Sequence, residues 1–243
     1  MPARSPRLAP ASSRGLAANL TAKLTAGLTA GLTAGLLALT LGGCGGADDA
    51  DAPDAGPTPT PAVEASPQDA WWANLSVPCG EAFPGSLGYA PPGDAMLEGE
   101  ELLVVHFDVC GADEIRLPFH IEKLDGSWDR SRTWIFRRTD DGRIELRHDH
   151  RRPDGAEDDQ TWYGAWTVDA GTATEQRFII ENREYPDGQL RGWRVIIEPG
   201  VRYTYGTIRG DAWSWRVDFD LSSPLDAPPP PAWGYEDGAG PPR

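Results

Sequence analysis

The strongest constraint on the fold is a strict alternation of residue types near the C-terminus. Five consecutive odd positions are apolar or aromatic, namely Trp213, Trp215, Val217, Phe219 and Leu221. Successive side chains of a β-strand point to opposite faces, so this pattern predicts a strand with one face in an apolar core.

Eight further short runs rich in β-branched and aromatic residues precede this one, and turn residues separate them. Asp125-Gly126, Asp141-Gly142 and Asp187-Gly188 are dipeptides typical of tight hairpins. No stretch within residues 71–223 shows a convincing helical period. The predicted strands cover residues 102–109, 115–124, 132–139, 143–150, 160–168, 175–183, 193–197, 201–205 and 213–221.

Strands that follow one another through tight turns favour an up-and-down antiparallel sheet. A sheet of about nine strands would leave two long edges unpaired, and closure into a barrel removes both edges. We therefore predict an all-β fold, an antiparallel up-and-down β-barrel of about nine strands. A β-sandwich is the alternative.

Residues 1–43 differ in composition from the rest of the chain. They carry four basic residues and no acidic one, and the run from Leu24 to Gly43 is uncharged. A basic start followed by an apolar run and small residues is the layout of a secretory signal peptide. A transmembrane helix is the alternative, because 20 uncharged residues can span a bilayer. The Gly and Thr content of the run and the Cys at its end favour the signal peptide.

The end of this run, Leu41-Gly42-Gly43-Cys44, resembles the lipobox of bacterial lipoproteins. The resemblance implies cleavage before Cys44 and a lipid on Cys44, which would make membrane lipid a partner of the protein. It also implies a place in the cell envelope, and Gly45 in place of Asp favours the outer membrane.

Two segments read as disordered. Residues 44–70 are acidic, contain five prolines and lack aromatic residues, so we expect a lipidated Cys44 followed by an extended tether. Residues 224–243 are Pro-rich, and we expect a disordered tail. The β-barrel domain is then predicted at 71–223, where Trp71-Trp72 would plug a barrel end or pack on its outside.

Two cysteines remain in the predicted domain, Cys79 and Cys110. An even pair in an exported protein is most simply a disulfide, with two separate buried thiols as the alternative.

The densest polar cluster runs from Arg147 to Gly155 and contains His148, Asp149 and His150. Three interpretations are open: a solvated loop, the polar wall of a ligand cavity, or a metal site, since imidazoles at i and i+2 can reach one ion. The other two histidines, His106 and His120, are out of phase with their apolar neighbours, so we expect both at the surface.

The strand register makes a sharper prediction for this cluster. Ile144, Leu146, His148 and His150 share one face, which we expect to point inward. The other face, with Glu145, Arg147 and Asp149, should then point to solvent, because an unpaired buried charge is costly.

The charge balance excludes nucleic acid as a partner, because 37 acidic and 22 basic residues give a net charge of −15. No nucleophile motif or Gly-rich phosphate loop occurs, so no catalytic residue can be assigned from the sequence, and we predict no metal or cofactor. Ten tryptophans exceed the usual need of such a core, so some are expected to line a cavity. The candidate site residues are His148, His150, Arg147, Asp149, Trp134, Trp162 and Trp166.

Several motifs together resemble a set of uncharacterised exported bacterial lipoproteins. They are Arg132-Thr133-Trp134, His148-Asp149-His150-Arg151, Tyr163-Gly164 and Arg216-Val217-Asp218-Phe219. The strand layout is similar to lipocalin-like (calycin-like) barrels, which implies binding of a small, partly apolar ligand. The alternatives are a structural or adaptor lipoprotein with a filled barrel, and a His-dependent enzyme. The size of the interior cavity separates the first two.

Overall fold

The computed structural model describes residues 64–94, 96–97, 99–181, 183–238 and 240. The predicted signal peptide, Cys44 and most of the predicted tether lie outside these residues. Within the described part of the chain, no helix is both long and apolar enough to cross a membrane.

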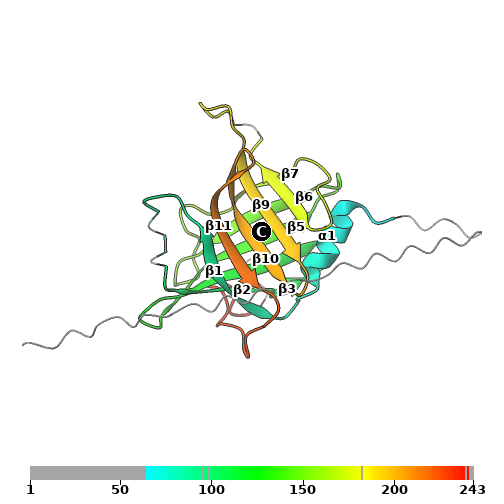
Figure 1. Cartoon of the computed structure of the whole chain (residues 1–243). Coiled ribbons are helices and arrows are strands. Elements are labelled where there is room, and N and C mark those ends of the chain that lie inside the picture. Colours follow the sequence, from blue (N-terminus) through cyan, green and yellow to red (C-terminus); the bar gives the residue numbers. More distant parts are fainter. Residues whose placement is uncertain (1–63, 95, 98, 182, 239, 241–243) are drawn as a thin grey trace, which may run out of the picture. The chain divides into compact units, whose positions relative to one another are not determined.

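The described residues form a closed antiparallel β-barrel, as the alternation of residue types predicts (Figure 1). Ten strands make the wall, and all nine predicted strands are among them. The elements are α1 Pro67–Ser76, β1 Ala82–Tyr89, β2 Leu102–His106, β3 Val109–Cys110, β4 Glu114–Glu122, β5 Trp128–Arg138, β6 Ile144–His150, β7 Tyr163–Thr167, β8 Glu175–Ile179, β9 Arg191–Glu198, β10 Arg202–Arg209 and β11 Ala212–Asp220.

The chain goes round the wall in order from β4 to β11, and each strand is antiparallel to the next. Strand β11 then pairs with β1, β1 with β2, and β2 with β4, so the ring closes. The two-residue strand β3 is an extra strand that pairs with β4. Closure leaves the wall without a long unpaired edge.

Strand β1 was not predicted. It contains Pro84, Gly85 and Gly88, which weaken a strand signal, and its pairing with β11 is irregular between Leu87 and Tyr89. It is nonetheless a wall strand, and Phe83 on it is part of the core.

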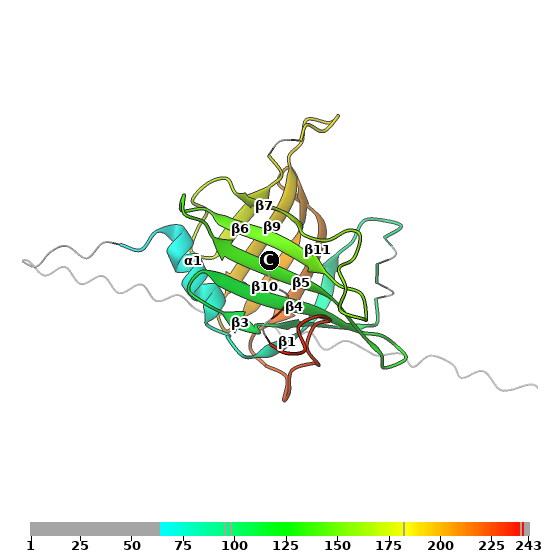
Figure 2. The same ribbon diagram turned by 180° about the vertical axis from the view of Figure 1, so that it is seen from behind.

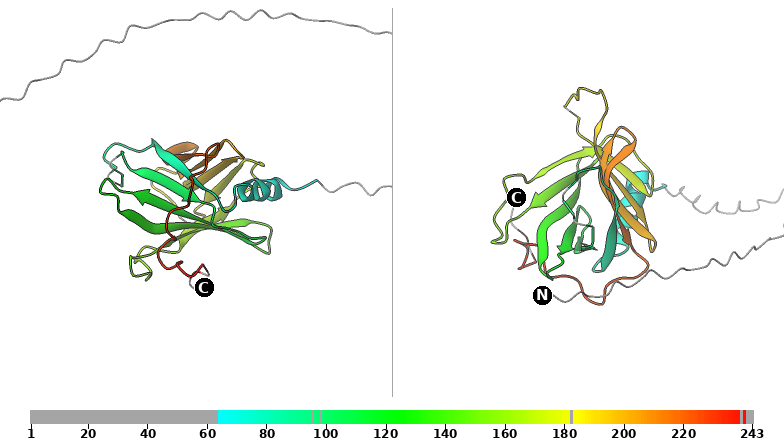
Figure 3. Two further views of the ribbon diagram at one scale, coloured as in Figure 1. Left: turned by 90° about the horizontal axis from the view of Figure 1, so that it is seen from below. Right: turned by 60° about the vertical axis from the view of Figure 1, so that its left-hand side comes forward.

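Helix α1 was also not predicted, and it covers one end of the barrel (Figure 3, left). It begins at a capping arrangement in which Ser66 accepts a hydrogen bond from the backbone N–H of Asp69, and Pro67 follows the cap. Trp71 is fully buried and contacts the rings of Phe136 and Phe178 edge-on. Of the two placements considered for Trp71, the plug is therefore the one observed.

The predicted disulfide between Cys79 and Cys110 is present, with the two Cα atoms 6.0 Å apart. It joins the segment between α1 and β1 to the short strand β3. The bridge thereby fastens the end-covering helix to the wall.

Residues 224–238, called the C-terminal strap below, pack against the outside of the barrel (red in Figure 2). Ala232 and Tyr235 are buried there, and the backbone N–H of Trp233 donates to the carbonyl of Arg130. The prediction of a disordered tail is wrong for this segment. The prediction overlooked apolar Ala232, Trp233 and Tyr235 that follow the prolines.

The expectation that His120 lies at the surface is wrong. Its ring is fully buried on the outer face of β4, beside Trp128, and His106 is half-buried nearby. Neither ring nitrogen of His120 has a hydrogen-bond partner among the described residues. Burial lowers the pKa of His120 to about 3, so the ring is neutral at physiological pH.

Candidate functional site

The barrel interior is divided into a filled half and a hollow half. Near α1 it is packed with side chains such as Phe136, Leu146 and Phe178. At the opposite end lies a cavity of about 440 Å³ that opens to solvent, called the mouth cavity below. Six aromatic side chains line it together with His148: Phe119, Trp134, Tyr163, Trp193, Tyr205 and Trp215.

Stacked rings form the floor of the mouth cavity. The ring of Trp134 stacks on that of Tyr205, with centroids 3.9 Å apart, and on that of Phe119, with centroids 5.0 Å apart. These residues come from β5, β10 and β4, whose inward faces meet at this level of the barrel. The stacked rings therefore make the floor a closely packed apolar layer.

His148 forms part of the wall, and both of its ring nitrogens are engaged. Nδ1 lies 3.1 Å from the backbone carbonyl of Tyr163, which can only accept, so Nδ1 carries the proton. Nε2 is then the acceptor, and the hydroxyl of Tyr205 donates to it. The imidazole stacks on the ring of Tyr163, with centroids 4.7 Å apart, and leans against Trp193.

The environment of His148 keeps it uncharged. Burial lowers its pKa to about 3, so it is neutral at physiological pH. Burial also raises the pKa of Tyr205 well above its ordinary value, so its hydroxyl stays protonated and able to donate. The pair is a fixed polar element of the wall, and neither nitrogen of His148 is free to bind a metal ion.

His150 and Arg132 lie at the rim of the mouth cavity, paired across β5 and β6. Nε2 of His150 lies 3.3 Å from the hydroxyl of Tyr163. Arg132 donates from Nη1 to the carboxylate of Asp129 at 2.9 Å. The rim is thus more polar than the floor.

The predicted register of β6 is confirmed in its inward face. Ile144 and Leu146 are core residues, and His148 and His150 continue their line into the mouth cavity. Of the three interpretations of this cluster, the geometry matches the polar wall of a cavity. Trp134, also predicted from the sequence, lies on the floor of the same cavity.

The structure separates Arg147 and Trp166 from these residues. Both lie on the outer face of the barrel, where the guanidinium of Arg147 is stacked over Trp166, 4.6 Å from the ring centroid. Arg147 is also paired with Glu145 on the same face. The prediction that they share a site with the histidines is therefore wrong.

Trp162 also faces outward, next to Arg137. Its backbone has a positive φ of 60°, which is uncommon for a residue other than glycine. The backbone N–H of Trp162 donates to the backbone carbonyl of His148 at 2.7 Å. Trp162 thus fixes the start of β7 beside the cavity wall without lining the cavity, and its prediction as a site residue is wrong.

Asp149 faces outward as predicted, but the expectation that it points to solvent is wrong. The C-terminal strap covers it, and its side chain is fully buried. Its carboxylate accepts hydrogen bonds from Arg151, Thr161 and Tyr235, at 2.9, 3.0 and 2.5 Å. A buried carboxylate with three donors is satisfied, so Asp149 belongs to the structural support behind the wall.

Four lining residues were not predicted from the sequence, namely Tyr163, Trp193, Tyr205 and Trp215. The signal that could have found them is topological. In an up-and-down barrel, the end of one strand and the start of the next lie at the same rim, so residues level with His148 on other strands line the same cavity.

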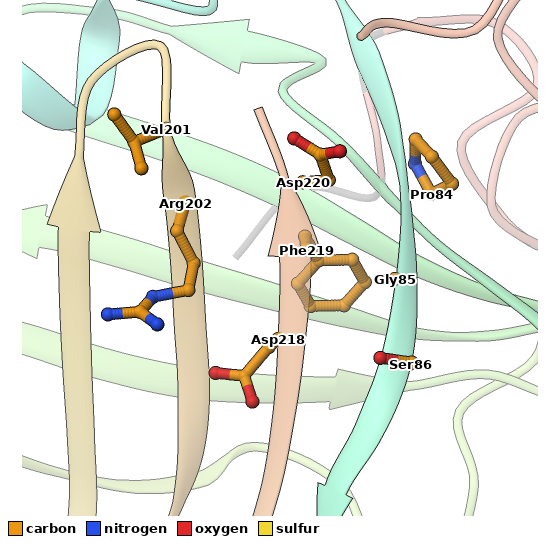
Figure 4. A pocket seen from close by; sticks show the side chains of 8 residues that line it. All are labelled: Pro84, Gly85, Ser86, Val201, Arg202, Asp218, Phe219 and Asp220. Atoms are coloured by element: carbon orange, nitrogen blue, oxygen red, sulfur yellow. The ribbon is translucent and has the colours of Figure 1, made fainter. Parts of the chain in front are cut away.

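A second depression lies on the outer surface, over β1, β10 and β11 (Figure 4). Its edges carry Arg202, Asp218 and Ser86, and Phe219 and Gly85 lie between them. Arg202 is paired with Glu198, and Asp218 accepts from Thr204 and Arg216. Because its polar groups have partners within the wall and it lies away from the histidines, the mouth cavity is the better candidate site.

Within the described ranges, no group of three or more His, Cys, Asp or Glu side chains is placed to hold a metal ion. Comparison with protein-family models, with curated proteins and with solved structures gives no significant match. The interpretation of the mouth cavity therefore depends on its own geometry.

Proposed function

We propose that this protein is a binding protein that holds a small, partly apolar ligand in the mouth cavity. The observation that carries the proposal is the uneven filling of the barrel. One half is packed with side chains, whereas the other holds a cavity of about 440 Å³ walled by aromatic rings. Small-molecule sites are typically apolar hollows of a few hundred Å³ with a few fixed polar groups.

The fixed polar groups are also of the expected kind. The pair of His148 and Tyr205 is held in one arrangement by hydrogen bonding and burial, and Thr207 and Ser214 bring hydroxyls to the rim. The cavity favours this function over a filled structural barrel, and the low pKa of His148, about 3, argues against a role for it as a base in a His-dependent enzyme.

The test uses the neutral fluorophore N-phenyl-1-naphthylamine, whose emission rises in apolar sites, together with native mass spectrometry of protein before and after organic extraction. We expect saturable binding of about one probe per chain, and competition by any extracted ligand. A Thr207→Trp substitution places an indole in the cavity and should abolish binding. Val168→Trp, at an exposed position outside the cavity, should not. Equal binding by both variants would overturn the proposal.

We further propose that the protein acts in the cell envelope, anchored through a lipid on Cys44. The lipobox-like Leu41-Gly42-Gly43-Cys44 and the acidic segment after it support this placement. A tether of this composition would let the barrel sample the space next to the membrane.

A further inference from the structure

The charged and polar groups around the mouth cavity are unevenly distributed. Its titratable lining residues are Asp94, Arg132, His148, His150, Tyr163 and Tyr205. His148 is neutral, and Asp94 accepts a hydrogen bond from the backbone N–H of Met96. Arg132 is the permanent cation among the described lining residues.

Arg132 is arranged so that part of its guanidinium remains available. The side-chain hydrogen bonds of Arg132 to Asp129 and to Ser131 both use the single nitrogen Nη1. The side chain is about one quarter exposed (26%) at the cavity rim. A guanidinium has five N–H donors in a planar fork, so a second acceptor can be held alongside Asp129.

The charge of Arg132 is felt across the cavity. Burial is the main cause of the lowered pKa of His150 and of the raised pKa of Tyr163 and Tyr205. In all three groups the charge of Arg132 then acts to lower the pKa. The charge of Arg132 therefore favours negative charge in the space between the three groups, although at His150 the nearby carboxylates of Asp129, Asp149 and Asp158 act in the opposite direction. Arg132 thus brings a cationic donor to the rim of a cavity whose floor is apolar.

From this arrangement we infer that the ligand is an anionic aromatic compound, whose ring system packs against the aromatic lining of the cavity and whose acidic group binds Arg132. This inference rests on the proposed function and names the chemical class of its ligand. The protein as a whole has a net charge of −15 and repels anions. Selectivity for an anion would therefore arise from the cavity and not from the general surface.

Two matched fluorophores test the inference. N-phenyl-1-naphthylamine and 1-anilinonaphthalene-8-sulfonate have the same aromatic body, and only the second carries a sulfonate. We expect the wild-type protein to bind the sulfonate probe about tenfold more tightly than the neutral one, which corresponds to one charge-assisted hydrogen bond. Added salt should weaken binding of the sulfonate probe and leave that of the neutral probe unchanged.

Variants locate the effect. Arg132→Gln should reduce affinity for the sulfonate probe about tenfold and affinity for the neutral probe less than twofold. Arg132→Lys, which keeps the charge, should retain part of the preference. Arg202→Gln makes the same change of net charge on the outer wall and should leave both affinities unchanged. Asp129→Asn removes the competing carboxylate and should raise affinity for the sulfonate probe.

The outcomes separate the two proposals. If neither probe binds the wild-type protein in the cavity, the proposed function fails. If the neutral probe binds as tightly as the sulfonate probe, at low and high salt alike, the function stands and the anionic ligand class is wrong. That comparison uses only the wild-type protein, so it remains decisive even if Arg132→Gln does not fold.

Discussion

Tyr235 donates a hydrogen bond to Asp149, 2.5 Å away and 86 residues earlier in the chain. The bond joins the C-terminal strap to β6 between the two histidines that face the mouth cavity. Thr161 also donates to Asp149, and its hydroxyl accepts from the backbone N–H of His150. The strap therefore supports the cavity wall from behind.

We predict that Tyr235→Phe lowers the free energy of unfolding by about 1–3 kcal/mol, because a buried carboxylate loses a charge-assisted donor. Urea denaturation followed by tryptophan fluorescence measures this change. Tyr89→Phe is the control, since Tyr89 is exposed and should tolerate the loss of its hydroxyl. Equal effects of the two substitutions would show that the strap does not support the wall.

Tyr203 and Tyr205 offer a matched pair on one strand. Both are buried with inward-facing rings, yet the hydroxyl of Tyr203 has no partner among the described residues, whereas that of Tyr205 donates to His148. Tyr203→Phe should raise the free energy of unfolding by about 1 kcal/mol, and Tyr205→Phe should lower it by about 1–3 kcal/mol. Thermal and urea unfolding of the two variants check the opposite signs. Destabilisation of similar size in both would contradict the hydrogen-bond assignment.

Acid should destabilise the fold before most carboxylates titrate. Burial lowers the pKa of both His120 and His148 to about 3, against an ordinary value of 6.5. Between these values the unfolded chain binds more protons than the folded one. The stability present above pH 6.5 is therefore lost as the pH falls, by about 1.4 kcal/mol per pH unit for each histidine.

Urea unfolding at pH 8 and pH 5 measures this loss. His120→Leu should remove about half of it, because an apolar side chain of similar size has no proton to bind. It should also leave stability at pH 8 unchanged or higher, since both nitrogens of His120 are without partners among the described residues. A free energy of unfolding that is the same at both pH values would rule out neutral buried histidines.

For the anchor, we predict that Cys44→Ala abolishes lipidation. In a bacterial host that processes lipoproteins, the wild-type protein should incorporate a fatty-acid probe and fractionate with membranes. The variant should remain unprocessed or stay outside the membrane fraction. Normal labelling and membrane fractionation of the variant would falsify the assignment of Cys44.

The predictable parts of the fold are those that local sequence patterns determine. The alternation from Trp213 to Leu221 and the Asp-Gly turns specify strands and hairpins within a few residues, and closure follows from the need to remove sheet edges. Strand β1 was missed because Pro84 weakens its strand signal. Helix α1 was missed because it is only ten residues long. The cap formed by Ser66, Pro67 and Asp69 was the available clue to the helix.

The candidate site was predictable only where it follows strand register. His148 and His150 were placed correctly because they continue the line of Leu146. Asp149 was misplaced because its burial depends on Tyr235, and no local pattern reports a contact made over such a sequence separation. Arg147 and Trp166 were misplaced because the sequence does not distinguish a tryptophan that is covered by a guanidinium on the outer wall from a tryptophan that lines a cavity.

The seal that Trp71 and α1 make at one end has a consequence for transport. A molecule that enters the mouth cavity meets packed side chains below Trp134 and must return by the way it came. The barrel is therefore closed at one end and open only at the other, so it does not form a channel. Such a shape suits carrying, storing or presenting one molecule at a time, and the residence time of that molecule would be set at the rim alone.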